Sequence, residues 1–216
     1  MQGDQYGKST IRNIYLDTPH HLLIRRSLEK PVYKEKLRIR SYTRVDDTST
    51  VFVELKKKYN SVVYKRRLAL SQNQAMDWMT QGIPPSEQNQ IYRELEYARQ
   101  FYKSLQPSVF LSYEREAFFG KENSDFRITF DENILFRTHN LSLTQPVGGQ
   151  AVLEQDKIIM EIKCAGGIPL WMVQILSEEK LYKTSFSKYG TAYRDYIFLQ
   201  QKENCYDFST AVSRTI

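Results

Sequence analysis

Hydrophobic and polar residues alternate along much of this chain, which is the period of a β-strand that buries one face. The alternating stretches are 10–18, 33–43, 50–59, 61–70, 108–120, 126–137 and 157–164. The short polar connection Tyr59-Asn60-Ser61 joins two of them. We therefore predict several largely antiparallel strands, with a β-hairpin over 51–70.

Other stretches carry apolar residues at intervals of three and four, which is the helical period. The clearest case is 86–105, where Ser86 is a candidate N-cap residue. Further helices are predicted at 20–28, after Ser71, at 168–180 and at 187–201. Helices that interrupt a set of antiparallel strands indicate an α+β fold.

The charged residues of the predicted strands fall mainly on one face. Lys36, Arg38 and Arg40 share one side of their strand, whereas Leu37 and Ile39 lie on the other. The same sorting adds residues from the later strands, namely Glu54, Lys56, Lys58, Lys65, Arg67, Arg115, Arg127, Thr129, Asp131, Glu161 and Lys163. This face is therefore strongly cationic and contains a few carboxylates.

Two arrangements of the sheet are compatible with such a face. An antiparallel sheet often has one solvated side, so an open sheet with a wet charged face is one of them. A solvated face usually mixes both signs of charge, whereas here the cations dominate nearly every strand. We therefore favour a closed antiparallel β-barrel, with the charged face lining a tunnel and amphipathic helices packed outside.

Composition agrees with a soluble protein that meets an anionic partner. The 216 residues carry a formal charge of +6, and neither a signal segment nor an apolar run long enough to span a membrane is evident. Cys164 and Cys205 do not suggest a disulfide framework, so we expect a cytoplasmic location. Carboxylates among cations suit a phosphate ligand joined by Mg²⁺ or Mn²⁺, and the three histidines lack zinc-ligand spacing.

The last predicted helix offers a further anion site. Ser187 can cap its N-terminus, and Lys188 stands beside the exposed backbone N–H groups. An ordinary helix start followed by a solvent-exposed lysine is the alternative interpretation.

Several short segments together resemble a known family. In chain order they are "IYLDT", "KLRIRSY", "VFVELKKKYNSVVYKRR", "SYEREAF", "FRITFD", "MEIK" and "SFSKYG". Their order resembles the VTC domain, the polyphosphate polymerase domain of the triphosphate tunnel metalloenzyme superfamily. The resemblance implies an antiparallel tunnel that moves the γ-phosphoryl group of ATP onto a growing polyphosphate chain, assisted by Mn²⁺ or Mg²⁺.

The resemblance also implies roles for individual residues. The implied catalytic cations are Arg38, Arg40, Lys56, Lys65, Arg67, Arg115 and Arg127. Glu161 of "MEIK" matches the metal-binding glutamate of the family, and Ser187 with Lys188 matches its phosphate contact. Lys163 and Lys183 complete the expected phosphate-binding set. Lys183 is included because Ser185 stands where another cation is expected.

The resemblance runs from about Ile11 to Tyr196 and divides the chain into three parts. We expect a flexible leader at 1–10, a VTC-like tunnel domain at 11–201 and a C-terminal tail at 202–216. Family members usually begin with an additional "E-x-K-Y"-like strand, and this sequence starts after that strand. We therefore expect a tunnel domain without its usual first strand.

Other functions are also compatible with this sequence. An enzyme of the same fold could hydrolyse triphosphates, and a binding module could hold polyphosphate without turnover. Nucleic-acid binding through basic strands is less favoured, because charges that point into a tunnel leave no open platform on which bases could stack. ATP and inorganic polyphosphate are therefore the expected partners, without nucleic acid, and the sequence does not define an oligomeric state.

Overall fold

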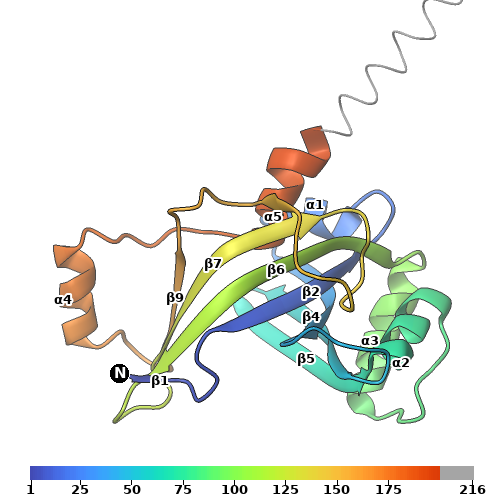
Figure 1. Cartoon of the computed structure of the whole chain (residues 1–216), viewed down its shortest axis with the longest axis horizontal. Helices are drawn as coiled ribbons and strands as arrows, with labels where there is room; N and C mark the ends of the chain where they lie inside the picture. Colours follow the sequence, from blue (N-terminus) through green and yellow to red (C-terminus); the bar gives the residue numbers. More distant parts are fainter. Residues whose placement is uncertain (200–216) are drawn as a thin grey trace, which may run out of the picture.

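The fold is built on one antiparallel sheet in the computed structural model, which describes residues 1–199 (Figure 1). The strands are β1 Gln2–Gly3, β2 Ser9–Asp17, β3 Tyr33–Ser41, β4 Thr50–Tyr59, β5 Val62–Ser71, β6 Gln106–Phe119, β7 Arg127–Arg137, β8 Gln150–Ala151 and β9 Ile159–Lys163. Their order in the sheet is β5-β4-β3-β2-β6-β7-β8, while β1 pairs with β6 and β9 pairs with β7. The predicted strands are thus confirmed.

The hairpin between β4 and β5 has the predicted tight turn. Asn60 and Ser61 both adopt positive φ angles, of 44° and 68°. Two central residues with positive φ match the right-handed twist of the flanking strands. The resulting register places Lys56 directly opposite Lys65 and Glu54 opposite Arg67.

Helical segments lie between the strands. They are α1 Leu22–Leu28, α2 Gln72–Met76, the π-helix η1 Asp77–Gln81, α3 Gln90–Tyr102, α4 Leu170–Glu178, α5 Lys188–Ala192 and the π-helix η2 Tyr193–Ile197. Ser71 caps α2 in a capping box with Gln74, as its position predicted. The prediction of Ser86 as the cap of α3 is wrong, because the Asn89 side chain accepts the N–H of Tyr92 instead.

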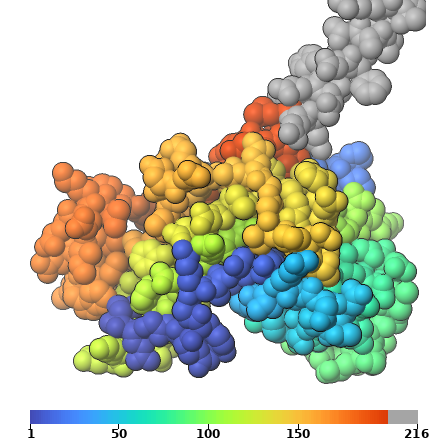
Figure 2. Space-filling view, viewed as in Figure 1, coloured from blue at the N-terminus to red at the C-terminus, as the bar shows by residue number. Residues whose placement is uncertain are grey.

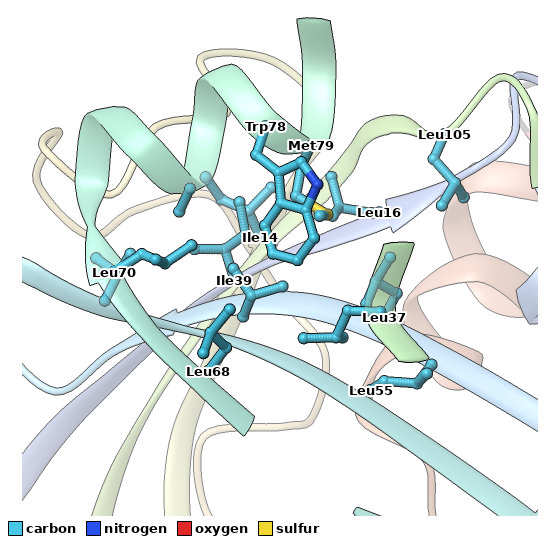
Figure 3. Packing of buried hydrophobic residues seen from close by; sticks show 14 of the residues in the cluster. Ile14, Leu16, Leu37, Ile39, Leu55, Leu68, Leu70, Trp78, Met79 and Leu105 are labelled. Atoms are coloured by element: carbon cyan, nitrogen blue, oxygen red, sulfur yellow. The ribbon is translucent and has the colours of Figure 1, made fainter. Parts of the chain in front are cut away.

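The apolar face of the sheet packs against α2, η1 and α3. Figure 3 shows Trp78 and Met79 of η1 beside Ile14, Ile39 and other sheet residues. Trp78 is fully buried and donates its indole N–H to Glu96 of α3 at 2.7 Å. The helices therefore cover the side of the sheet that the alternation marked as apolar.

The opposite face is covered at one end by the last helical segments. Tyr189 of α5 stacks on Tyr15 of β2 with ring centroids 4.8 Å apart. Ile24 of α1 and Tyr193 of η2 belong to the same buried cluster. The rest of this face remains available to its charged residues. Helix α4 lies apart from the other helices (Figure 1), and its one buried residue, Met172, belongs to a third apolar cluster with Phe126 and with Ile128 of β7.

Closure of the sheet into a barrel is not seen in residues 1–199. Within this part of the chain β5 pairs with β4 alone, so it does not join β8 or β9 at the other end of the order. Part of the expected leader belongs to the sheet, because β1 pairs with β6 and β2 begins at Ser9. The expected tail, and the last two residues of the predicted 187–201 helix, lie outside the described residues.

Candidate functional site

The cations predicted on one face do lie together on one side of the sheet. We call this surface the basic face, and its cations are Lys36, Arg38, Arg40, Lys56, Lys58, Lys65, Arg67, Arg115, Arg127, Lys163 and Lys188. Strand register aligns them in rows. Lys36 lies opposite Lys56, and Lys56 lies opposite Lys65. At the other end of the sheet, Arg127 lies opposite Lys163.

The basic face is curved. Strands β3, β2, β6 and β7 separate β4 from β9 in the sheet. Nevertheless β9 acts electrostatically on Lys56 of β4. Desolvation and Arg38 lower the pKa of Lys56, Glu161 opposes that shift, and Lys163 adds to it. Coulombic effects weaken with distance, so an effect of β9 on Lys56 is expected where the open sheet curves around its charged residues.

Glu54 is a buried carboxylate that binds cations from two neighbouring strands. Its side chain is 1% exposed and contacts Arg38 Nη2 at 2.7 Å and Lys65 Nζ at 2.8 Å. Arg67 Nε donates to it at 2.7 Å, and Arg40 Nε lies 3.9 Å away. Although desolvation raises the pKa of Glu54, these cations, Arg38 foremost, lower it to about 2. Glu54 is therefore an internal counter-ion that fixes the surrounding side chains.

Asp131 has the corresponding role on β7. It is 1% exposed and accepts two hydrogen bonds from Arg115, at 2.6 and 2.7 Å, and one from Lys188 Nζ at 2.5 Å. Arg115 and Lys188 also lie over the ring of Tyr113, at 5.2 and 4.6 Å from its centroid. Lys188 is thereby held on the basic face. This placement differs from the exposed lysine of the alternative interpretation.

Asn13 and Tyr113 hold Arg40 in place. Arg40 Nε donates to Asn13 Oδ1 at 2.8 Å, and Arg40 Nη2 donates to the Tyr113 hydroxyl at 3.1 Å. The amide of Asn13 in turn donates to the carbonyl of Leu111 at 3.0 Å. Arg40 is thus oriented by neutral hydrogen-bond partners while it lies beside Glu54.

Lys36 connects the sheet to the start of α5. Its Nζ donates to Ser187 Oγ at 2.7 Å, and the same hydroxyl caps α5 by accepting the N–H of Gly190. Desolvation lowers the pKa of Lys36 to about 8, with Lys34, Lys56 and Arg38 adding to the shift against an opposing effect of Tyr15. No carboxylate forms an ion pair with Lys36 within residues 1–199, so an anionic ligand would find this charge uncompensated.

Tyr15 is a second group on this face with a shifted pKa. Burial raises the pKa of its phenol, but Arg38, Lys36 and Arg40 outweigh that effect and lower it to about 8. Arg38 Nη1 donates to the Tyr15 oxygen at 3.2 Å. Neighbouring cations contribute to both shifts, although desolvation is the main cause for Lys36 and opposes the shift of Tyr15.

Glu161 differs from the other two carboxylates because its side chain is 47% exposed. It lies 3.3 Å from Lys163 and 4.0 Å from Arg115. Thr129 is directly opposite Glu161 in the register, and its buried hydroxyl has no hydrogen-bond partner in the described part of the chain. Glu161 is therefore the carboxylate of this face that can still accept an added ligand.

A divalent cation fits this arrangement only in part. No group of three or more metal-ligating His, Cys, Asp or Glu side chains occurs in residues 1–199. Mg²⁺, however, is commonly held by one or two carboxylates together with phosphate oxygens and water. Glu161 can supply such a carboxylate, whereas Glu54 and Asp131 are already saturated by cations.

One of the predicted site residues lies elsewhere. Lys183 is exposed in the segment between α4 and α5 and makes no contact with the basic face in the described part of the chain. Conversely, the structure adds residues that were not assigned to the site: Asn13, Tyr15, Lys36, Tyr113 and Asp131. Face sorting pointed to Lys36 and Asp131. Nothing in the sequence pointed to Tyr15, Tyr113 or Asn13, because their hydrogen bonds are made to arginines on another strand.

A curved antiparallel sheet with a cationic concave face and helices on its apolar side defines a tunnel-type domain. The crystal structure of a "putative adenylate cyclase" from Bacillus halodurans has a similar fold, with a TM-score of 0.52 and 15% identity over 85% of this chain and 81% of that chain. At this identity the similarity concerns the fold alone.

The family of this chain follows from its sequence rather than from its fold. The VTC domain model matches residues 2–196, so the chain belongs to the VTC domain family, whose tunnel domains are polyphosphate-related. No curated protein matches the chain. Within the described residues no helix is both long and apolar enough to cross a membrane.

Proposed function

We propose that this protein is a polyphosphate polymerase-type phosphotransferase, which moves the γ-phosphoryl group of ATP onto a growing polyphosphate chain. The observation that supports this most directly is the row of Lys36, Lys56 and Lys65 in direct cross-strand register. Like charges directly opposite one another are destabilising unless an anion lies between them. A linear polyanion would neutralise such a row along its whole length.

The cations on this face would act mainly by positioning. Phosphoryl transfer requires little covalent chemistry from a protein, and its loose transition state carries charge on the equatorial oxygens. Arg38 and Arg115 present planar donor sets, each already oriented by a buried carboxylate. Such preorganised arginines would hold the donor and acceptor phosphates in line.

Acceptance of the phosphoryl group needs no general base in this proposal, because the end of a polyphosphate chain is already anionic. Mn²⁺ or Mg²⁺ held at Glu161 would neutralise charge on the phosphates. Because ATP is the proposed donor, we propose that the protein acts in the cytoplasm.

Non-catalytic binding of polyphosphate is the second candidate. It is favoured by the saturation of Glu54 and Asp131, which leaves Glu161 as the carboxylate available to a metal. Hydrolysis of triphosphates by the same face would use water as the acceptor and needs the same metal.

Product analysis separates these functions. The chain would be incubated with ATP and Mn²⁺, and the phosphate products sized by gel electrophoresis beside an orthophosphate assay. Chains longer than three phosphates are expected, together with ADP. Orthophosphate without longer chains would indicate a hydrolase. Retention of labelled polyphosphate without any product would indicate a binding module, and displacement of that label by single-stranded DNA would contradict a polyphosphate-specific site.

A further inference from the structure

A second group of basic and hydroxyl side chains lies on the opposite face of the sheet, at the edge of the apolar core. We call it the Arg12 cluster, and it consists of Arg12, Ser41 and Arg44. Arg12 of β2 lies directly opposite Ser41 of β3. Their chain neighbours Asn13 and Arg40 belong to the basic face, so Arg12 and Ser41 point to the other side. The cluster is therefore separate from the proposed polyphosphate site.

Two buried polar groups of this cluster have no partner among residues 1–199. The Nε of Arg12 and the hydroxyl of Ser41 are both buried there without a hydrogen bond. Ser41 is 1% exposed as a residue. Buried donors are nearly always satisfied, since an unpaired one loses its bonds to water without compensation. Two such groups on directly opposed residues indicate that something outside the described chain accepts their hydrogen bonds.

The charge of the cluster is also uncompensated. Within residues 1–199 no carboxylate forms an ion pair with Arg12 or Arg44. Asp46, two residues after Arg44, accepts hydrogen bonds from Thr48 and Ser49, and Glu114 of β6 is bound by Lys8. Burial lowers the pKa of Arg12, and the charge of Arg44, which follows Ser41 by three residues in the chain, lowers it further. Two neighbouring arginines without an acid favour a bound anion.

Arg44 gives the cluster one solvent-exposed side chain, and two loops are joined beside it. Arg44 is exposed, and its Nε donates to the carbonyl of Thr144 at 2.6 Å. This bond joins the 42–49 segment to the 138–149 loop, and Figure 2 shows these two segments side by side on one face of the molecule. Arg137 in turn donates to carbonyls of the same loop at Asn140, Ser142, Pro146 and Gly148.

We propose that Arg12, Arg44 and Ser41 form a second anion site, which binds a phosphoryl dianion outside the basic face. The ligand is inorganic phosphate or the terminal phosphate of a small phosphorylated molecule. A guanidinium presents parallel N–H donors that match two oxygens of a phosphate, and the Ser41 hydroxyl adds a third donor from the adjacent strand. This site does not depend on the proposed polymerase function, because it uses none of the residues of the basic face.

Nuclear magnetic resonance tests the site directly, since a buried arginine Nε–H gives its own signal. The full-length chain labelled with ¹⁵N would be titrated with inorganic phosphate at constant ionic strength, set with sodium chloride. We expect saturable shifts of the Arg12 Nε–H and of the Ser41 amide. Arg12→Gln should weaken phosphate binding at Ser41 roughly tenfold or more, because it removes a charge-assisted pair of hydrogen bonds.

Matched variants distinguish specific phosphate binding at Arg12 and Ser41 from nonspecific attraction to positive charge. Arg93→Gln removes an exposed arginine of α3 and should leave the Ser41 titration unchanged. Ser41→Ala retains every charge, so it provides the test if Arg12→Gln fails to fold. We expect it to weaken the Arg12 Nε–H titration several-fold while phosphate-induced shifts at Lys56 persist. Glycerol phosphate in place of inorganic phosphate would show whether an esterified phosphate is preferred.

Three results would overturn the proposal. The Arg12 Nε–H signal could stay unchanged up to high phosphate concentrations, as expected if water alone fills the site. It could shift equally when chloride replaces phosphate. The Ser41→Ala protein could fold and bind phosphate at Arg12 with unaltered affinity.

Discussion

Lys36 on β3 donates a 2.7 Å hydrogen bond to Ser187, the residue that caps α5. The two residues are 151 positions apart in the sequence, so this contact is made only in the folded chain. It brings an ammonium group that has no carboxylate partner within residues 1–199 to the beginning of a helix whose next residue, Lys188, is bound to Asp131. The end of the basic face is thus built from the sheet and from the C-terminal helical segment together.

Lys36 and Tyr15 predict how anion binding depends on pH. Each has a pKa of about 8 in the free protein. As the pH rises through that value, Lys36 loses its positive charge and Tyr15 gains a negative one, so the affinity for tripolyphosphate should fall between pH 7 and pH 9. Calorimetric titrations measure this slope. Lys36→Arg and Tyr15→Phe should each flatten it, and an unchanged slope in both variants would contradict the assignment.

The same two groups affect stability with the opposite sign. In the unfolded chain lysine and tyrosine keep their protons until about pH 10, whereas in the free folded protein both lose them near pH 8. The unfolded state therefore binds more protons between these values, and this contribution to the free energy of unfolding increases with pH. Urea unfolding at pH 8 and pH 9.5 measures this increase in the free energy of unfolding. The Lys36→Arg, Tyr15→Phe double variant is the control. An equal increase in the double variant would assign the effect to other groups.

Glu54→Gln should destabilise the protein by about 3 kcal/mol, because it leaves the buried ends of several cations without their counter-ion. Glu154→Gln is the matched control, because Glu154 forms an exposed ion pair with Lys157. This substitution should lower the free energy of unfolding by less than about 1 kcal/mol, measured by urea unfolding. Tripolyphosphate should restore part of the lost stability of Glu54→Gln. Equal stabilities of the two variants would show that Glu54 is not the organising counter-ion.

Acid should reveal the same role of Glu54. Its pKa in the folded protein is about 2, below the usual value of a glutamate. The stabilisation from this lowered pKa is fully present above the pKa of the unfolded glutamate, about 4.3, and is lost as the pH falls toward 2. The stability difference between the wild type and Glu54→Gln should therefore shrink below pH 4. A difference that stays constant down to pH 2 would contradict this interpretation.

The hairpin cations should differ in their effect on stability. Lys56 forms no ion pair in the described part of the chain, so Lys56→Ala should weaken polyphosphate binding and leave the melting temperature of the free protein unchanged or slightly higher. Lys65 and Arg67 both bind Glu54, so their alanine variants should weaken binding and also lower the melting temperature. Lys103→Ala, at the exposed end of α3, is the control. Identical binding and salt dependence across the set would contradict a ligand on this face.

Glu161→Gln tests the proposed metal role. It should abolish metal-dependent turnover and leave polyphosphate binding unchanged or slightly tighter, because a negative charge is removed from a cationic surface. The ion pairs of Glu161 are partly exposed, so the melting temperature of the Glu161→Gln protein should differ little from that of the wild type. Turnover with the wild-type metal dependence would reject the metal role. A large loss of stability without loss of turnover would indicate a structural salt bridge.

The sequence by itself determined the strands and the side of the sheet on which each residue lies. This information is local, because the alternation of side chains along a strand has a period of two whatever the strand pairs with. It was therefore possible to assign Arg38, Lys56 and Arg115 to one face before any partner was known. The hairpin turn at Asn60-Ser61 and the cap at Ser71 were also predictable, since their signals span only a few residues.

The tertiary structure decided which charges neutralise one another. Register between strands, and the docking of α5, bring Lys188 to Asp131 and Lys36 to Ser187 across long stretches of sequence. Alternation alone could not show that Glu54 and Asp131 are saturated by cations while Glu161 is still accessible. Nor could it show that the sheet bends without closing in residues 1–199, because pairing between distant strands depends on packing and twist over the whole sheet.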